Sequence, residues 1–286
     1  MIVFVGAVVI GATGAFFSDT ETSTGNTFTA GAIDLTIDNE SYVTNDAGVL
    51  VASPNTSWSL GDLSDLGTNG GSGLARLFFN FEDLKPGDVG EDTISIHVNN
   101  NDAWLCMATR ITGTPENNQT EPEAIVDTSS GVDSGELQGA LNFVFWPDDG
   151  DNVLEVNEYA GGLGVFTGTA ESFMNTSPRI VADSTFNIFA GGPTTTPTPL
   201  TGGIDYHIAK AWCFGTLGFA PVSVGENPTV ATGITCNGAS LDNSTQTDGV
   251  KGDIEFYAVQ SRNNSTFTCE ANYTPSWGGD GSPGNN

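Results

Sequence analysis

Residues 84–100 read LKPGDVGEDTISIHVNN, and this stretch contains the two signals that decide the fold. Its Pro-Gly pair predicts a tight turn, because proline presets one backbone angle and glycine readily adopts the other. After the turn, Ile94, Ile96 and Val98 alternate with polar residues, which is the period of a strand with one buried face. A turn followed by an alternating strand indicates a β-sheet protein.

Similar strand signals recur on both sides of this stretch. We expect further strands, where apolar residues alternate or run together, at 33–37, 77–81, 103–113, 141–146, 205–215 and 253–260. Between them lie an acidic turn at 148–158 and the run PTTTPTP at 193–199, which predicts a stiff exposed loop. Several strands at irregular spacing predict an all-β protein, a jelly-roll-type β-sandwich with long loop insertions.

Composition and charge narrow the classes of partner. The chain has 286 residues, of which 38% are hydrophobic, so a sizeable core can form in one large all-β domain. Its 35 acidic and 7 basic residues give a net charge of -28, which would repel a phosphate backbone and argues against nucleic acid as a partner. Two interpretations of the acidity stay open: solubility in salt or outside the cell, or binding of divalent cations at particular clusters.

The chain has four cysteines, and none of them stands in a C-x-x-C pair, which argues against a zinc ribbon or a thioredoxin-like site. An even number in an exported protein favours two disulfides, with three connectivities open. The modest loop between Cys213 and Cys236 favours that pair, and it leaves Cys106 with Cys269.

The two ends of the chain differ in character from the middle. Residues 1–15, MIVFVGAVVIGATGA, form a signal-peptide-like apolar leader that is too short for a confident transmembrane helix and lacks a basic region. We expect cleavage after Ala15; the alternative is that the leader is retained and buried in a neighbouring subunit. Residues 277–286, WGGDGSPGNN, predict a disordered tail.

Three segments together suggest a family. They are FFSDTETSTGNTFTAGAIDLTID from Phe16, LKPGD from Leu84 and AVQSRNN from Ala258. In these segments the chain resembles the TasA/CalY (camelysin) family of exported, filament-forming biofilm-matrix and pilus proteins. The middle third of the chain is not covered by these anchors. Scarce basic residues and four cysteines depart from the bacterial matrix members of the family.

The resemblance implies jelly-roll subunits that assemble by donor-strand complementation, in which the N-terminal segment of one subunit pairs with a sheet of the next. It implies a donor strand at 16–28 before a sandwich domain at 29–276. The donor-strand residues would be Phe16, Phe17, Thr20, Thr22, Thr24, Thr27 and Phe28, with Phe17 and Phe28 as the apolar anchors. Such a head-to-tail contact does not close on itself and would produce a filament. The alternative is a loose leader left after processing.

The expected function is therefore a structural subunit of an extracellular filament, pilus or biofilm matrix fibre, and not an enzyme. Its partners would be copies of itself at the cell surface or in the matrix, with membrane contact only during export. Two alternatives are a secreted camelysin-like metalloprotease and a monomeric calcium-stabilised surface adhesin. The protease has little support, because the sequence has no H-E-x-x-H motif and its two histidines, His97 and His207, stand alone on strand-like segments.

One cluster has the composition of a calcium site, in the segment WPDDGDNVLEVNE at 146–158. Calcium takes six to eight oxygen ligands, which closely spaced carboxylates and backbone carbonyls supply. The candidate ligands are Asp148, Asp149, Asp151, Glu155 and Glu158. The EF-hand pattern is incomplete, and the alternative is a solvated acidic turn. No organic cofactor is expected.

Eight N-x-[ST] sequons predict glycosylation of the exported protein's surface, although a chain rich in Asn and Thr also produces sequons by chance. The candidate acceptors are Asn39, Asn55, Asn118, Asn175, Asn243, Asn263, Asn264 and Asn272.

Overall fold

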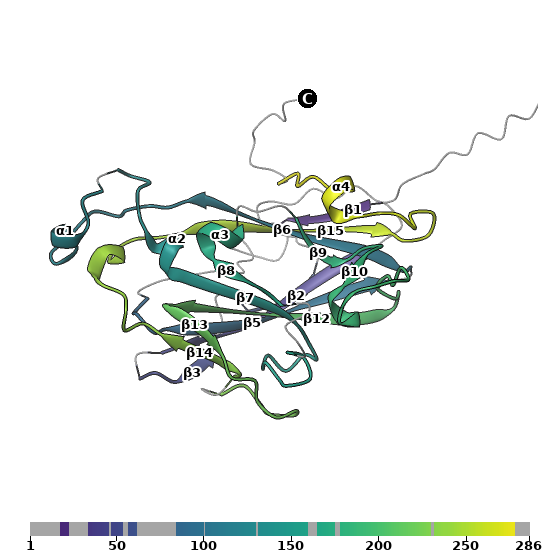
Figure 1. The fold of residues 1–286 in the computed structure, drawn as a ribbon, viewed down its shortest axis with the longest axis horizontal. Coiled ribbons are helices and arrows are strands. Elements are labelled where there is room, and N and C mark those ends of the chain that lie inside the picture. The colour runs from purple at the N-terminus through teal and green to yellow at the C-terminus, as the bar shows by residue number, and fades with distance from the viewer. Residues whose placement is uncertain are drawn as a thin grey trace, which may run out of the picture.

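The computed structural model describes residues 18–22, 34–45, 47–53, 57–61, 84–99, 101–129, 131–159, 165–174, 178–229 and 232–277. In this part of the chain two antiparallel sheets face each other, with short helices at their margins (Figure 1). The predicted all-β sandwich is confirmed, whereas its jelly-roll connectivity stays a prediction. The predicted strand at 77–81 and the leader at 1–15 lie outside the described residues.

The first sheet, called sheet A, has six strands among the described residues, and β1 lies at one end of it. Their order is β1 (Ser18–Thr22), β15 (Lys251–Gln260), β6 (Ala103–Gly113), β9 (Arg179–Ala182), β10 (Phe186–Asn187) and β11 (Gly192–Pro193).

The second sheet, called sheet B, has seven strands in the part of the chain that the structure describes. Their order is β3 (Leu50–Ala52), β2 (Asp34–Thr44), β5 (Val89–Asn99), β12 (Ile204–Phe214), β7 (Leu141–Asp148) and β8 (Phe166–Thr169), and β4 (Trp58–Gly61) also pairs with β2. A separate two-stranded sheet joins β13 (Thr216–Phe219) to β14 (Ile234–Asn237).

The helices are all short in the described residues. They are α1 (Glu123–Val126), α2 (Leu137–Ala140), α3 (Ala170–Met174), α4 (Cys269–Asn272) and the 3-10 turns η2 (Ile188–Ala190) and η3 (Asn243–Thr245). Among the described segments, no helix has the length and apolar character needed to cross a membrane.

The main core lies between the two sheets and follows the predicted alternation. Ile94 and Ile96 of β5 are fully buried in it. Ile254 and Phe256 enter the same core from sheet A. Burial of each such side chain contributes about 1.5–3 kcal/mol to the free energy of unfolding. The two sheets are therefore held together by the apolar faces that the sequence pattern predicts.

Other segments of the chain cover the outer face of each sheet. In each case a disulfide bonds the covering segment to a strand of the sheet. On sheet A, Cys106 of β6 is bonded to Cys269 of α4. On sheet B, Cys213 of β12 is bonded to Cys236 of β14. Both predicted pairings are confirmed. Two disulfides indicate an oxidising, non-cytoplasmic environment.

Candidate functional site

The first candidate site is the edge of sheet A, where the N-terminal strand pairs with β15. β1 is antiparallel to β15, with Ser18 opposite Val259 and Thr22 opposite Glu255. In the described part of the chain β15 is the only ladder partner of β1, which is the end strand of its sheet. The strand therefore depends on main-chain hydrogen bonds to one neighbour.

The predicted donor-strand residues fall partly within this edge. Thr20 and Thr22 belong to β1, which pairs with β15 of its own chain. The remaining predicted donor residues, Phe16, Phe17, Thr24, Thr27 and Phe28, lie outside the described residues.

β15 is held firmly on its other side. It pairs along its length with β6, from Lys251 opposite Gly113 to Gln260 opposite Ala103. Its inward residues belong to the main core, and its Tyr257 stacks at 4.7 Å on Tyr273 over the outer face. The strand that receives β1 is thus supported by core, sheet and outer cover together.

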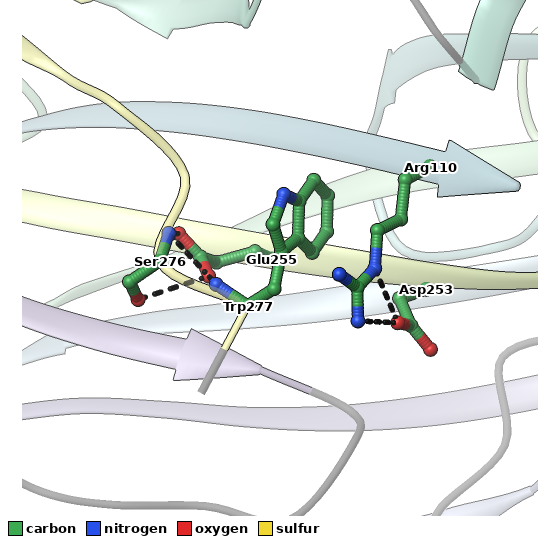
Figure 2. Close-up of polar contacts among 5 residues, drawn as sticks. All are labelled: Arg110, Asp253, Glu255, Ser276 and Trp277. Carbon is green, nitrogen blue, oxygen red and sulfur yellow. Dashed lines mark hydrogen bonds and ion pairs between the residues drawn. The ribbon is translucent and has the colours of Figure 1, made fainter. Parts of the chain in front are cut away.

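The outer cover includes the C-terminal segment 273–277, whose last residue, Trp277, is the first residue of the predicted disordered tail. The fully buried Glu255 carboxylate accepts hydrogen bonds from the Ser276 N–H at 3.0 Å and the Trp277 N–H at 2.6 Å (Figure 2). It also accepts one from the Tyr273 hydroxyl at 2.5 Å. The prediction that the disordered tail begins at Trp277 is therefore wrong, because the buried Glu255 carboxylate on β15 accepts a hydrogen bond from the backbone N–H of Trp277. Residues 278–286 lie outside the described part.

We call residues 273–277 together with Glu255 the C-terminal clamp. Arg110 lies against this clamp. Its guanidinium lies 4.7 Å from the centre of the Trp277 ring and 2.7 Å from Asp253 Oδ2 (Figure 2). Burial and the Glu255 carboxylate both raise the pKa of Tyr273, so the phenol stays a hydrogen-bond donor. The clamp lies over the outer face of the strand to which β1 pairs.

The second candidate site is the acidic turn that follows β7. Ligand oxygens of Asp148, Asp149 and Glu158 lie within 4.8 Å of one another. Asp148 Oδ2 accepts from the Gly150 N–H at 3.0 Å, and Glu158 Oε1 accepts from the Asp149 N–H at 2.9 Å. Backbone amides therefore hold the carboxylates of Asp148 and Glu158, and the Asp149 carboxylate lies beside them.

Burial and mutual repulsion disfavour the charged forms of these carboxylates. Burial, with neighbouring Asp151 and Asp149, raises the pKa of Asp148 to about 7. Burial, with Asp148 and Asp149, raises the pKa of Glu158 to about 8. One oxygen of Asp148, Oδ1, is buried and has no hydrogen-bond partner in the described structure. The turn thus gathers negative charge that its own hydrogen bonds only partly compensate.

The predicted calcium ligands are only partly brought together. Asp148, Asp149 and Glu158 meet, whereas Asp151 Oδ1 accepts from the Val153 N–H at 3.0 Å. Glu155 is fully buried; one of its oxygens accepts from the Gly225 N–H, and the other has no partner among the described residues.

Sequence reasoning missed Glu91, which is buried beside this turn. Burial raises its pKa well above the usual range, Asp92 and Asp148 add to this, and Thr232 opposes it. Neither of its oxygens has a hydrogen bond of normal geometry within the described chain. Glu91 is on the face of β5 that alternation assigns to solvent, so its burial follows from the outer cover of sheet B.

The two histidines occupy separate positions on that outer face. His97 lies between Asp205, 2.7 Å from Nδ1, and Asp38, 3.2 Å from Nε2. His207 Nδ1 lies 3.2 Å from Ser95 Oγ. In the described segments, the clusters of three or more potential metal ligands contain no histidine.

The predicted glycosylation sites differ in exposure. Asn39 is 2% exposed, and its amide donates to Asp92 Oδ1 at 3.3 Å, which leaves no room for a glycan in the folded chain. Asn118, Asn243, Asn263 and Asn272 are exposed, Asn264 is half-buried, and Asn55 and Asn175 lie outside the described residues.

Comparison of the chain with protein-family models gave no match, and comparison with curated proteins gave no significant match.

Proposed function

We propose that this protein is a structural subunit of an extracellular filament, in which the N-terminal strand is exchanged between neighbouring copies. The observation that supports this most directly is the pairing of β1 with β15 at the end of sheet A. Because that pairing consists of main-chain hydrogen bonds, the same strand of a second copy can form it equally well. Exchange of an identical element is a common route to assembly.

The support around β15 favours it as an acceptor for a second copy. The β6 ladder, the Cys106–Cys269 disulfide and the C-terminal clamp all hold its surroundings without any contribution from β1. A subunit whose β1 has left would keep a formed acceptor strand with an open edge. An open edge of this kind attracts a further strand.

Repeated donation in one direction would build a filament. If each subunit gives β1 forward and receives a strand at β15, the contact is head-to-tail and leaves one free donor and one free acceptor at the two ends. Growth then continues as long as copies are supplied. The oxidising environment indicated by the two disulfides suits assembly outside the cell.

We also propose a structural calcium ion at the acidic turn. The donors at Asp148, Asp149 and Glu158 are all oxygens, as calcium requires, and the buried Asp148 Oδ1 lacks a partner in the described chain. A cation there would offset the repulsion that raises the pKa values of these groups and would fix the cover of sheet B.

Deletion of residues 16–28 tests the filament proposal by electron microscopy. We expect the truncated protein to keep its fold, measured by circular dichroism, and to form no regular fibres. A matched variant that lacks only residues 1–15 should still assemble, since it keeps the donor segment. Regular fibres from the protein without residues 16–28 would contradict the proposal, and a full-length protein that stays monomeric would favour the adhesin alternative.

A further inference from the structure

Two loops meet at the end of the sandwich where β6 ends and β15 begins. The first of them contains the short helix α1, which projects from this end (Figure 1). The first loop, 114–136, follows β6, and the second, 242–250, precedes β15. They are joined by the Gly249 N–H, which donates to the Pro115 carbonyl at 2.8 Å, and by the Thr247 hydroxyl, which donates to the Asn118 carbonyl at 2.8 Å. Residues far apart in the sequence are therefore brought into contact.

Three carboxylates converge where these loops meet, and we call Glu116, Glu123 and Asp248 the loop acidic site. Their ligand oxygens lie within 4.8 Å of one another. Glu116 is 5% exposed and Glu123 is 0% exposed. Each of the three has one buried oxygen without a hydrogen-bond partner in the described structure: Oε1 of Glu116, Oε1 of Glu123 and Oδ1 of Asp248.

The second oxygen of each carboxylate is held in place. Glu123 Oε2 accepts from the Thr247 hydroxyl at 2.9 Å, and Asp248 Oδ2 accepts from the Glu136 N–H at 2.5 Å. Glu116 Oε2 accepts a longer hydrogen bond, at 3.4 Å, from the Ser129 hydroxyl. One oxygen of each group thus fixes the side chain, while the other is buried and unsatisfied. A buried polar atom in this state costs free energy unless a ligand satisfies it.

The charged neighbours that shift the pKa values of Glu116 and Asp248 are all negative. Burial raises the pKa of Glu116, and Asp127, Glu136 and Glu123 add to the rise. Burial also raises the pKa of Asp248, to about 6, with Glu116, Glu136 and Glu123 contributing. No lysine or arginine is among the causes of either shift. A divalent cation would relieve the repulsion and satisfy the three free oxygens together.

A second set of ligand oxygens, from Glu116, Asp127 and Glu136, shares Glu116 with the loop acidic site. Asp127 differs from the others because it is already satisfied. It accepts hydrogen bonds from the Ser129 N–H at 2.8 Å and the Ser129 hydroxyl at 3.0 Å, and the hydrogen bonds lower its pKa. Of the two sets, only the loop acidic site has an unsatisfied oxygen on each of its three carboxylates in the described structure, which favours Glu116, Glu123 and Asp248 as the cation ligands.

We propose that the loop acidic site binds calcium and ties loop 114–136 to loop 242–250. Calcium accepts an irregular shell of carboxylates, backbone carbonyls and water, whereas magnesium demands near-ideal octahedral geometry and seldom takes a dedicated protein cage. The site shares no residue with the acidic turn. It does not depend on strand exchange.

Counting bound ions tests the proposal. The full-length protein is depleted with a chelator, CaCl₂ is added, and bound ions are counted by native mass spectrometry and titrated by calorimetry. We expect Glu123→Gln to lose one calcium ion per chain and Asp133→Asn, which removes an exposed carboxylate from the same loop, to lose none. Glu158→Gln, which alters only the acidic turn, should keep the ion at the loop acidic site. Magnesium should bind there at least tenfold more weakly.

Hydrogen exchange provides a second measurement, first on the unaltered protein and then on the variants. CaCl₂ should slow amide exchange in loops 114–136 and 242–250, and Glu123→Gln or Glu116→Gln should abolish this slowing while the circular dichroism spectrum stays native. An unchanged ion count in Glu123→Gln would overturn the proposal. Exchange in both loops that does not respond to CaCl₂ would also overturn it.

Discussion

The ammonium group of Lys210 lies 2.7 Å from Asp92 Oδ2, and both side chains point into the sandwich, with exposed fractions of 0% and 2%. Lys210 stands directly opposite Asp92 across the β12–β5 ladder. The Ser41 hydroxyl donates to the other carboxylate oxygen of Asp92. Burial lowers the pKa of Lys210, and the Asp92 carboxylate opposes this effect. The core of this protein therefore contains a charge pair whose members depend on each other.

Removing one member of the Lys210–Asp92 pair should lower the stability of the fold. We expect Lys210→Met to lower the free energy of unfolding by about 3–5 kcal/mol, because Asp92 stays buried without its counter-charge. The double variant Lys210→Met with Asp92→Asn should recover a large part of this loss. Lys251→Met, at an exposed site, should change stability by no more than about 0.5 kcal/mol. Denaturant titrations measure all three, and a Lys210→Met protein as stable as the parent would contradict the account.

The C-terminal clamp should depend on the charge of Glu255. In Glu255→Gln the charge is removed and a single oxygen remains to accept from the Tyr273 hydroxyl and the Ser276 and Trp277 N–H groups, so at least one of these hydrogen bonds is lost and the others are weakened. We expect a loss of about 2–3 kcal/mol, in the range for hydrogen bonds to a charged group. Faster amide exchange at 273–277 would report release of the clamp. Glu270→Gln, on the exposed side of α4, is the control, and equal exchange in both variants would refute the prediction.

The acidic turn should make the stability of calcium-free protein fall as the pH rises. Folding raises the pKa of Asp148 from 3.8 to about 7 and that of Glu158 from 4.5 to about 8. The folded state therefore holds protons that the unfolded chain has already released, so these groups favour folding below about pH 4 and this advantage is lost by about pH 8.

Thermal unfolding in the presence of a chelator measures this effect. We expect Tm to fall between about pH 4 and 8, and Glu158→Gln should make the fall shallower. Saturating calcium should reduce it in the parent protein, because the ion binds the deprotonated carboxylates. A chelated parent whose Tm has the same pH dependence as that of Glu158→Gln would count against the assignment.

Much of the fold could be predicted because strand alternation and core burial express the same physical requirement. Ile94 and Ile96 alternate with polar residues in the sequence and are buried in the structure. The polar residues on the other face of a strand do not show whether another part of the chain will cover that face. Glu91 occupies such a face, and only the tertiary position of the outer cover makes it buried.

The candidate sites also differ in whether the sequence alone could predict them. Asp148, Asp149 and Glu158 could be proposed because they are close in the sequence as well as in space. The loop acidic site could not, because Asp248 reaches Glu116 and Glu123 only when β6 and β15 pair. Trp277 was misassigned for a similar reason, since a Gly-rich sequence does not show that a buried carboxylate binds its first residue.

Strand exchange itself is tested most directly by a cross-link between two different chains. Ser18 and Val259 are opposed across the β1–β15 ladder, where Cα atoms come close enough for a disulfide. Chains that carry Ser18→Cys are mixed with separately tagged chains that carry Val259→Cys, assembled and then oxidised. A mixture of Ser18→Cys with Lys251→Cys, at the far end of β15, is the register control.

Strand exchange should give a reducible dimer that contains one chain of each tag, with the new disulfide identified by mass spectrometry, and no such dimer in the register control. The double variant with both cysteines in one chain should form a ladder of covalent oligomers. A disulfide that forms only within single chains of the double variant, and never between chains of the mixture, would contradict strand exchange.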